Sequence, residues 1–178
     1  MSFSDREMLS IWLVPQEPEY SQLQLLIRRV AELTGGPVFE PHVTILADIP
    51  LTPSEVVVRS GRQFRSLAPL ELVALRVESG TSYFKSLFME IDPTFALSRV
   101  HSVACSLVSP GRVAGEFEPH VSLAYGTPTC AANPKVAKLV DRTIPMRLGF
   151  RNVSVVQASR FTPIAEWCCK EIIRLDGD

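Results

Sequence analysis

The pentapeptide Phe-Glu-Pro-His-Val occurs twice in this chain, at residues 39–43 and 117–121. A hydroxyl residue follows each copy directly, Thr44 after the first and Ser122 after the second. An identical five-residue segment that recurs in a chain of 178 residues indicates an internal structural repeat. The fold must therefore accommodate two similar units, each of which carries a histidine, within one small protein.

The residues that precede the two copies also correspond. An apolar segment at 9–15 predicts a strand, and apolar residues at helical spacing between about 19 and 33 predict a helix. The second copy is preceded by a predicted strand at 86–91 and a predicted helix at about 93–108. The order of elements is thus the same in both halves.

The correspondence continues after the motifs. Thr52 and Asn133 are each followed by a proline, which is typical of a helix N-cap and first turn. Further strands are predicted at 71–79, at 148–159 and at 167–176. Each half is therefore predicted to contain, in order, a strand, a helix, the motif strand, a second helix and a last strand.

This pattern predicts an α+β fold formed by one bilobal domain over residues 1–178, with repeat halves at roughly 8–79 and 83–159 and a final strand at 167–176. We expect two pseudo-symmetric lobes, each with an antiparallel sheet flanked by helices. An approximate two-fold would place the two motif strands side by side, with a cleft between the lobes.

Composition narrows the function. The chain is 46% hydrophobic and 21% charged, which is typical of a folded protein. The 18 Lys and Arg against 19 Asp and Glu give a net charge of −1, which disfavours a protein that binds long nucleic acids. The first residues lack the pattern of a signal peptide and no apolar run could span a bilayer, so we expect a cytoplasmic protein without a membrane partner.

The four cysteines show no spacing that is typical of a metal site. Cys105, Cys130, Cys168 and Cys169 form no CxxC motif and have no histidine at zinc-finger spacing. We interpret them as reduced, buried thiols. The sequence predicts neither a metal nor another cofactor.

The two motifs combine groups that suit phosphate chemistry. Residues two apart in a strand point to the same face, so His42 lies beside Thr44 and His120 beside Ser122. A hydroxyl can donate to a phosphate oxygen, and two imidazoles can act as acid and base near neutral pH. An isolated histidine on a strand is more often a core residue, but repetition of both side chains favours a functional pair.

Other polar residues near the motifs allow two interpretations. Glu40 and Glu118 share the face of the histidines, so they either orient the imidazoles or lie solvated at the strand entrance. His101 lies in a predicted helix without a hydroxyl partner, and we interpret it as a half-buried or surface residue.

With these residues, the chain resembles the two-histidine (2H) phosphoesterase superfamily, which has a LigT-like fold and two HxT/S motifs. The segments SIWLVP, PHVT, Tyr83-Phe84 and PHVSLAY are similar to those of cyclic phosphodiesterases that open ADP-ribose 1'',2''-cyclic phosphate and nucleoside 2',3'-cyclic phosphates. The resemblance implies metal-independent hydrolysis to ADP-ribose 1''-phosphate and nucleoside 2'-phosphates. A small nucleotide would be the only partner, and we expect a monomer.

The resemblance also implies roles for individual residues. His120 would activate water and His42 would protonate the leaving oxygen, although pseudo-symmetry leaves the two roles interchangeable. Thr44 and Ser122 would bind the phosphate, and Tyr125 would complete its pocket. Tyr83 or Phe84 would offer a ring to the base, and strand alternation would let only one of them face the cleft. Lys85 is either a phosphate contact or a solvated charge.

Two other functions remain open from the sequence. One is RNA end processing by a 2',5' ligase or exonuclease of the same superfamily, which would require a basic surface beside the cleft. The other is a nucleotide-binding module without turnover, which the intact motifs disfavour. Two histidines of ordinary pKa would place the activity maximum near neutrality.

Overall fold

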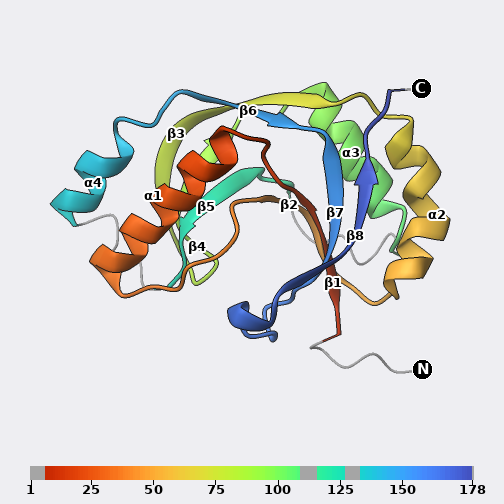
Figure 1. Ribbon diagram of the computed structural model, residues 1–178, viewed down its shortest axis with the longest axis horizontal. Coiled ribbons are helices and arrows are strands. Elements are labelled where there is room, and N and C mark those ends of the chain that lie inside the picture. Colours follow the sequence, from red (N-terminus) through yellow and green to blue (C-terminus); the bar gives the residue numbers. More distant parts are fainter. Residues whose placement is uncertain (1–6, 109–115, 127–132, 178) are drawn as a thin grey trace.

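The computed structural model describes residues 7–108, 116–126 and 133–177. They form an α+β fold in which four α-helices flank one curled antiparallel sheet of eight strands (Figure 1). The elements, in chain order, are β1 (Leu9–Leu13), α1 (Glu19–Thr34), β2 (Val43–Ile49), α2 (Pro53–Arg65), β3 (Leu70–Ser82), β4 (Lys85–Ile91), α3 (Phe95–Cys105), β5 (His120–Ala124), α4 (Pro134–Val140), β6 (Met146–Phe150), β7 (Asn152–Gln157), the 3₁₀ turn η3 (Ile164–Glu166) and β8 (Cys168–Arg174).

The sheet has the strand order β6-β3-β4-β5-β2-β1-β7-β8. It consists of two four-stranded halves that meet where β2 pairs with β5, and the register there places Val43 opposite Val121. These valines are the fifth residues of the two repeated pentapeptides. The prediction that the motif strands lie side by side is confirmed.

Strands from both repeats are interleaved in each half of the sheet. β3, from the first repeat, pairs with β4 and β6 of the second, and β7 pairs with β1 of the first. The single strand predicted at 148–159 is wrong, because the chain leaves one half of the sheet after β6 and enters the other at β7. Arg151 separates the two strands, and no local pattern marks so short a crossing.

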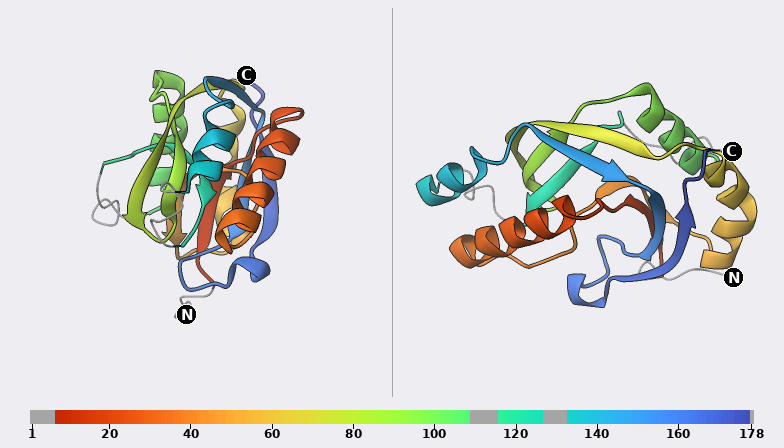
Figure 2. Two further views of the ribbon diagram at one scale, coloured as in Figure 1. Left: turned by 90° about the vertical axis from the view of Figure 1, so that its left-hand side faces the viewer. Right: turned by 45° about the horizontal axis from the view of Figure 1, so that its top comes forward.

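The helices also cross between the halves. α1 packs on β5 and β6 and lies beside α4, whereas α2 packs on β7 and β8 and α3 packs on β2. Figures 1 and 2 show these two pairs of helices at opposite ends of the molecule. Thr52 and Asn133 cap α2 and α4 as predicted, and Gly35 ends α1 with a left-handed φ of 72°.

Burial separates the two faces of the sheet. In β1 the side chains of Leu9, Ile11 and Leu13 enter the main core with the helices, while Trp12 belongs to a small apolar cluster on the other face. All five residues of β1 are buried, because neighbouring residues cover both faces of this strand. Its one polar side chain, Ser10, donates a hydrogen bond to the oxygen of Ala158. The second face is the one that carries the motif side chains.

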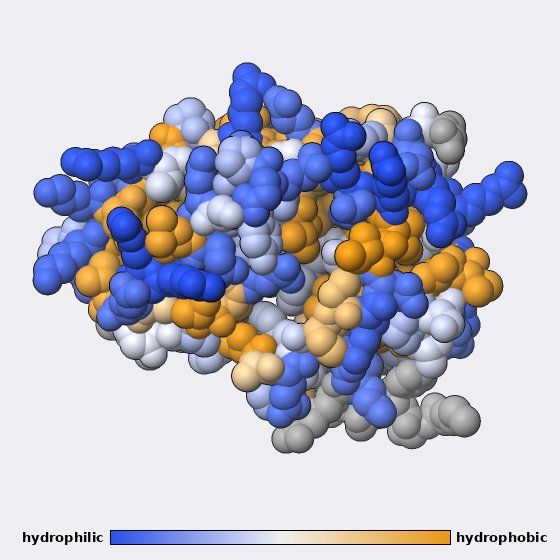
Figure 3. Space-filling view, in the orientation of Figure 1, coloured by the Kyte–Doolittle hydropathy of each residue, from blue (hydrophilic) through white to orange (hydrophobic). Residues whose placement is uncertain are grey.

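The face of the molecule seen in Figure 3 is mainly hydrophilic, and its hydrophobic residues lie in small groups. None of the helices in the described ranges is both long and apolar enough to cross a membrane. The prediction of buried thiols is wrong for Cys168 and Cys169, which are exposed because β8 is an edge strand, while Cys105 is partly buried. Cys130 lies outside the described residues.

Candidate active site

One cavity of about 340 Å³ lies on the second face of the sheet, within the size range of small-molecule sites. The strand face carries both motif pairs into it, since His42, Thr44, His120 and Ser122 all line the cavity. The remaining lining residues come from β1, the end of β2, the β3–β4 hairpin, the residue after β5 and the segment after β7: Ser10, Trp12, Ala47, Asp48, Ser82, Phe84, Lys85, Tyr125, Ala158, Ser159, Arg160 and Trp167.

Both motif histidines are oriented in the same way. Nδ1 of His42 lies 2.7 Å from the backbone oxygen of Glu40, and Nδ1 of His120 lies 2.8 Å from that of Glu118. A carbonyl oxygen only accepts hydrogen bonds, so each Nδ1 carries the proton and donates. Each Nε2 therefore remains available on the cavity side to take or give a proton.

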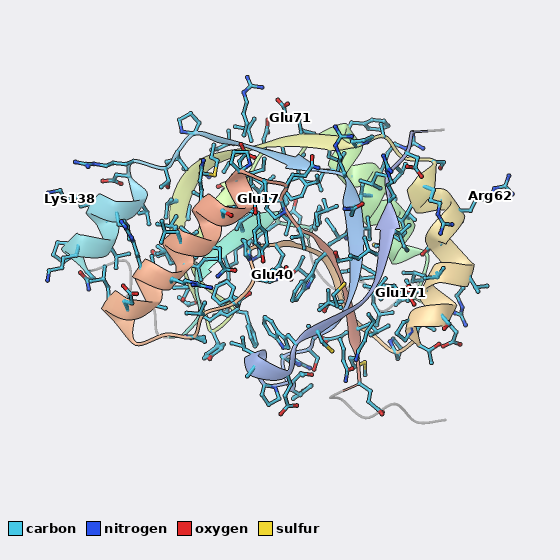
Figure 4. All side chains as sticks on the ribbon, viewed as in Figure 1. Glu17, Glu40, Arg62, Glu71, Lys138 and Glu171 are labelled. Carbon is cyan, nitrogen blue, oxygen red and sulfur yellow. The ribbon has the colours of Figure 1, made fainter. Side chains whose placement is uncertain are left out.

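These contacts resolve the role of the repeated glutamates. Their backbone carbonyls orient the imidazoles, whereas their carboxylates make other contacts. Glu40 accepts a hydrogen bond from the Tyr20 hydroxyl at 3.3 Å, and Glu118 pairs with Lys85 at 2.5 Å. Figure 4 shows Glu40 near the middle of the molecule, between the ends marked by Lys138 and Arg62.

The surroundings of His42 favour its neutral form. Its ring stacks on Trp12 with 3.6 Å between centroids and 9° between planes, and the residue is only 6% exposed. Burial lowers the pKa of His42 to about 4, with a smaller contribution from the nearby His120. The unliganded protein thus holds this imidazole uncharged at neutral pH.

His120 lies in a more open environment. It is partly buried, and its ring meets the edge of Phe88 at a centroid distance of 5.3 Å. Burial lowers the pKa of His120, the Lys85 ammonium lowers it further, and the Glu118 backbone and carboxylate oppose the shift. Lys85 also lies 4.5 Å from the Phe88 ring centroid, so it belongs to the cavity wall and is not simply a solvated charge.

The two hydroxyls differ in their existing contacts. Ser122 donates to the backbone oxygen of Phe84 at 3.0 Å and shares a side-chain hydrogen bond with Tyr125. No partner for the Thr44 hydroxyl is found among the described residues. Tyr125 is 4% exposed, stacks on Phe39 and has a pKa raised by burial, so it offers a neutral phenol to the cavity.

The two aromatic candidates lie in a turn and not in a strand. Ser82 pairs with Lys85, so Tyr83 and Phe84 are the two residues that connect β3 and β4, and strand alternation does not apply to them. Phe84 lines the cavity, whereas Tyr83 is 51% exposed and reaches the site only through its ring contacts with Phe84 and Tyr125.

Sequence reasoning did not find several cavity residues. Trp12 lies opposite Thr44 in the β1–β2 ladder, which pairing between the first strand and the motif strand could have suggested. Trp167 lies 5.5 Å from Trp12 and 6.0 Å from Tyr125 between ring centroids, but nothing in its local sequence indicates this position. Asp48 also reaches the cavity, from the end of the motif strand β2, and Arg160 reaches it from a segment that carries no motif.

His101 lies outside the cavity, in agreement with its interpretation from the sequence. It is partly buried on α3, stacks on Phe117 at 4.1 Å and lies 3.4 Å from the sulfur of Cys105. Within the described ranges, no three His, Cys, Asp or Glu side chains are grouped so that they could hold a metal ion.

Acid should destabilise the fold through His42. Its pKa is about 4 in the folded protein and near 6.5 when unfolded, so between these values the unfolded chain binds more protons. Stability should therefore fall as the pH falls from 6.5 to 4, by about 3 kcal/mol from this residue. Denaturant titrations from pH 7.5 to 4 would measure the loss.

A His42→Gln variant provides the matched comparison, because glutamine does not titrate in this range. Its stability should depend less steeply on pH than that of the wild type. Identical slopes for the two proteins would show that His42 is not the residue that the fold holds neutral.

Comparison with known proteins agrees with the geometry. Residues 8–167 match the family model described as cyclic phosphodiesterase-like protein. The chain belongs to this family. This match confirms the resemblance to 2H phosphoesterases predicted from the motifs.

The curated relatives include a cyclic phosphodiesterase of Arabidopsis thaliana, which is 25% identical over 125 residues. The match covers 67% of this chain and 66% of that relative. TT0787 of Thermus thermophilus has a similar structure, with a TM-score of 0.61 at 16% identity over 96% of this chain and 99% of that one. E. coli LigT complexed with 3'-AMP has a TM-score of 0.63 at 11% identity, with 95% and 98% covered. The LigT-like fold is confirmed.

Proposed function

We propose that this protein hydrolyses cyclic phosphodiesters without a metal ion. Nucleoside 2',3'-cyclic phosphates would yield nucleoside 2'-phosphates, and ADP-ribose 1'',2''-cyclic phosphate would yield ADP-ribose 1''-phosphate. The observation that carries the proposal is the pair of imidazoles, each fixed through Nδ1 by a backbone carbonyl, with both rings in the wall of one cavity. The similarity to a curated cyclic phosphodiesterase supports it.

The reaction requires one proton to be removed and one to be supplied. A base takes a proton from water as the water oxygen forms a bond to phosphorus. The bond from phosphorus to the 3'-oxygen breaks, and an acid protonates that oxygen. Two imidazoles on either side of a phosphate provide both groups without further cofactors.

The burial of the two histidines suggests which one performs each step. His42 is nearly inaccessible, stacked on Trp12 and uncharged at neutral pH, as a base must be. Burial and the Lys85 ammonium also lower the pKa of His120, but this ring is more open and the Glu118 backbone oxygen and carboxylate oppose the shift, so His120 is the more readily protonated of the two. We therefore assign the base to His42 and the acid to His120, the reverse of the roles that the family resemblance implies.

The hydroxyl groups would hold the phosphate during the reaction. Thr44 and Ser122 are each two residues after a histidine on the same strand face, so a phosphate between the imidazoles lies within reach of both. The ribose and base would occupy the rest of the cavity, where Phe84 and Trp167 offer apolar rings. Binding of 3'-AMP by the structurally similar LigT supports a small nucleotide as the ligand.

Turnover of a substrate panel tests the proposal. The panel contains the four nucleoside 2',3'-cyclic phosphates, ADP-ribose 1'',2''-cyclic phosphate and a short RNA that ends in a cyclic phosphate, each assayed with and without a chelator. We expect hydrolysis of the small substrates to 2'- or 1''-monoesters at rates that the chelator leaves unchanged. A restorable requirement for divalent ions, or turnover of the RNA alone, would contradict the proposal.

Replacement of Thr44 by valine should lower activity more than replacement of Ser122 by alanine. The Thr44 hydroxyl gives up no contact with a described residue, whereas Ser122 must leave its bond to Phe84 before it can donate to phosphate. A hydrogen bond to a charged group typically contributes enough for a loss of about 10- to 150-fold in kcat/KM for Thr44→Val. Steady-state kinetics with a 2',3'-cyclic nucleotide would measure it.

Thr44→Ser is the control, because it keeps the hydroxyl and removes only a methyl group. It should retain most of the activity. Equal losses for Thr44→Ser and Thr44→Val would mean that the side chain fills space and does not bind phosphate.

A further inference from the structure

The cavity extends beyond the motif residues to the far ends of three neighbouring strands. There the lining consists of Ser10 on β1, Asp48 on β2 and the segment from Ala158 to Arg160 after β7. Ser10 donates a buried hydrogen bond of 2.8 Å to the oxygen of Ala158, which fixes this segment to β1. The outer end of the cavity is therefore built on the sheet and is held in place by it.

Asp48 is aimed into this end by an irregularity in the strand. Leu9 pairs with Ile49 and Ile11 with Leu46, so two steps along β1 span three along β2. Asp48 has a φ of 55°, a left-handed conformation that residues other than glycine seldom adopt. Such bulges often redirect a side chain next to an active site, and here the result is a carboxylate in the cavity wall.

Arg160 is presented by a tight turn. The Thr162 amide donates to the Ser159 oxygen at 3.1 Å, the two hydroxyls lie 2.9 Å apart, and the Trp167 indole donates to the Thr162 oxygen at 3.0 Å. The guanidinium lies 4.8 Å from the Phe161 ring centroid. These hydrogen bonds hold the ends of the turn at residues 159–162 together. Arg160, the second residue of this turn, lines the cavity.

The charged side chains of Asp48 and Arg160 do not neutralise each other. No ion pair joins Asp48 to Arg160, and none with another described residue is found for either. The other cation of the cavity, Lys85, pairs with Glu118 beside His120. The outer end therefore presents one acceptor group and one donor group with no net charge, which suits an uncharged ligand that has both donors and acceptors better than a second phosphate.

From this juxtaposition, and resting on the function proposed above, we propose that Asp48 and Arg160 read the base of the substrate and select guanosine 2',3'-cyclic phosphate. Guanine alone among the four bases presents two adjacent N–H donors, N1 and N2, that match the two oxygens of a carboxylate. Its O6 and N7 are the pair of acceptors that a guanidinium binds in bidentate fashion. Cytosine offers only a pair of adjacent acceptors, N3 and O2, and adenine and uracil offer neither pair.

The test measures kcat/KM for the 2',3'-cyclic phosphates of guanosine, inosine and uridine. Inosine lacks only the N2 amino group, so it isolates the contact with the carboxylate. One bidentate contact typically discriminates by about 5- to 150-fold. We expect the wild type to prefer guanosine over uridine by at least the lower of these factors, and guanosine over inosine by a smaller one.

Two variants separate the contacts. Asp48→Asn keeps a residue that tolerates the left-handed backbone, and it should bring the guanosine-to-inosine ratio close to one. Arg160→Gln should lower turnover of the guanosine and inosine substrates together. Asp141→Asn and Arg142→Gln, on exposed residues outside the cavity, are the matched controls and should leave all ratios unchanged.

Direct binding distinguishes this proposal from the one it rests on. Titration calorimetry with guanosine, inosine and uridine 2'-monophosphates measures base preference even if no substrate turns over. Hydrolysis of all three substrates at equal rates, or equal affinities for the three monophosphates, would overturn guanine selection and leave the hydrolytic function standing. A guanosine preference that survives Asp48→Asn would also overturn it.

Discussion

Replacing His42 or His120 with glutamine is expected to lower kcat/KM for a cyclic nucleotide by about 10²- to 10⁴-fold, the usual contribution of a general acid or base. Glutamine keeps a polar side chain of similar length that can still donate to the carbonyl of Glu40 or Glu118, but it cannot transfer a proton. The cavity should therefore keep its form, and the loss should appear in kcat more than in KM.

The variant with both histidines replaced by glutamine should have a kcat/KM only slightly lower than that of the less active single variant. Acid and base act in one displacement, so their contributions are not additive. His101→Gln is the matched control, because this histidine stacks on Phe117 outside the cavity and should be dispensable. If a folded His42 or His120 variant turned over substrate at nearly the wild-type rate, the two-histidine mechanism would be wrong.

The activity maximum is expected between pH 4 and 6.5, on the acidic side of the neutral optimum that two ordinary histidines would give. The base must be neutral, and the pKa of His42 is about 4, so kcat/KM should rise as the pH increases through that value. The acid must be charged, and burial holds the pKa of His120 below 6.5. Above the pKa of His120, kcat/KM should fall about tenfold per pH unit.

Profiles of kcat/KM from about pH 3 to 9 on wild type and on the two glutamine variants would measure this, because they include the His42 pKa of about 4. The substrate is a cyclic phosphate whose charge does not change in the range. His42→Gln should lose the acidic limb and His120→Gln the alkaline limb. The opposite pattern would exchange the roles of base and acid, and a flat wild-type profile would remove the case for imidazole catalysis. The limbs belong to the interacting pair, because each histidine is within the influence of the other.

Local signals in the sequence were sufficient for the order of elements and for the reactive groups. The repeated pentapeptide located His42 and His120, and alternation along a strand placed Thr44 and Ser122 on their face. The helical spacing of apolar residues, the capping residues and the glycines that end helices are signals that extend over only a few residues. The sequence therefore predicts the helices at nearly their observed bounds.

The pairing of the strands and the packing of the helices on them follow from contacts between residues that are distant in the sequence. Pairing of β3 with β4 and β6, and of β7 with β1, joins strands that are distant in the chain, and it divides the predicted strand at 148–159 between the two halves of the sheet. The same pairing brings Trp12, Trp167 and Arg160 to the cavity from three segments without a motif, beside Asp48 at the end of the motif strand β2.

The physical character of the site also depends on neighbours that are remote in sequence. A histidine has a pKa near 6.5 by itself, and the low value for His42 arises from burial beneath Trp12 and other cavity residues. The repeated motifs alone identify the groups that can transfer protons and hold a phosphate. Burial and strand pairing, which sum contributions from the whole chain, decided their protonation states and the part of the cavity that is left for the base.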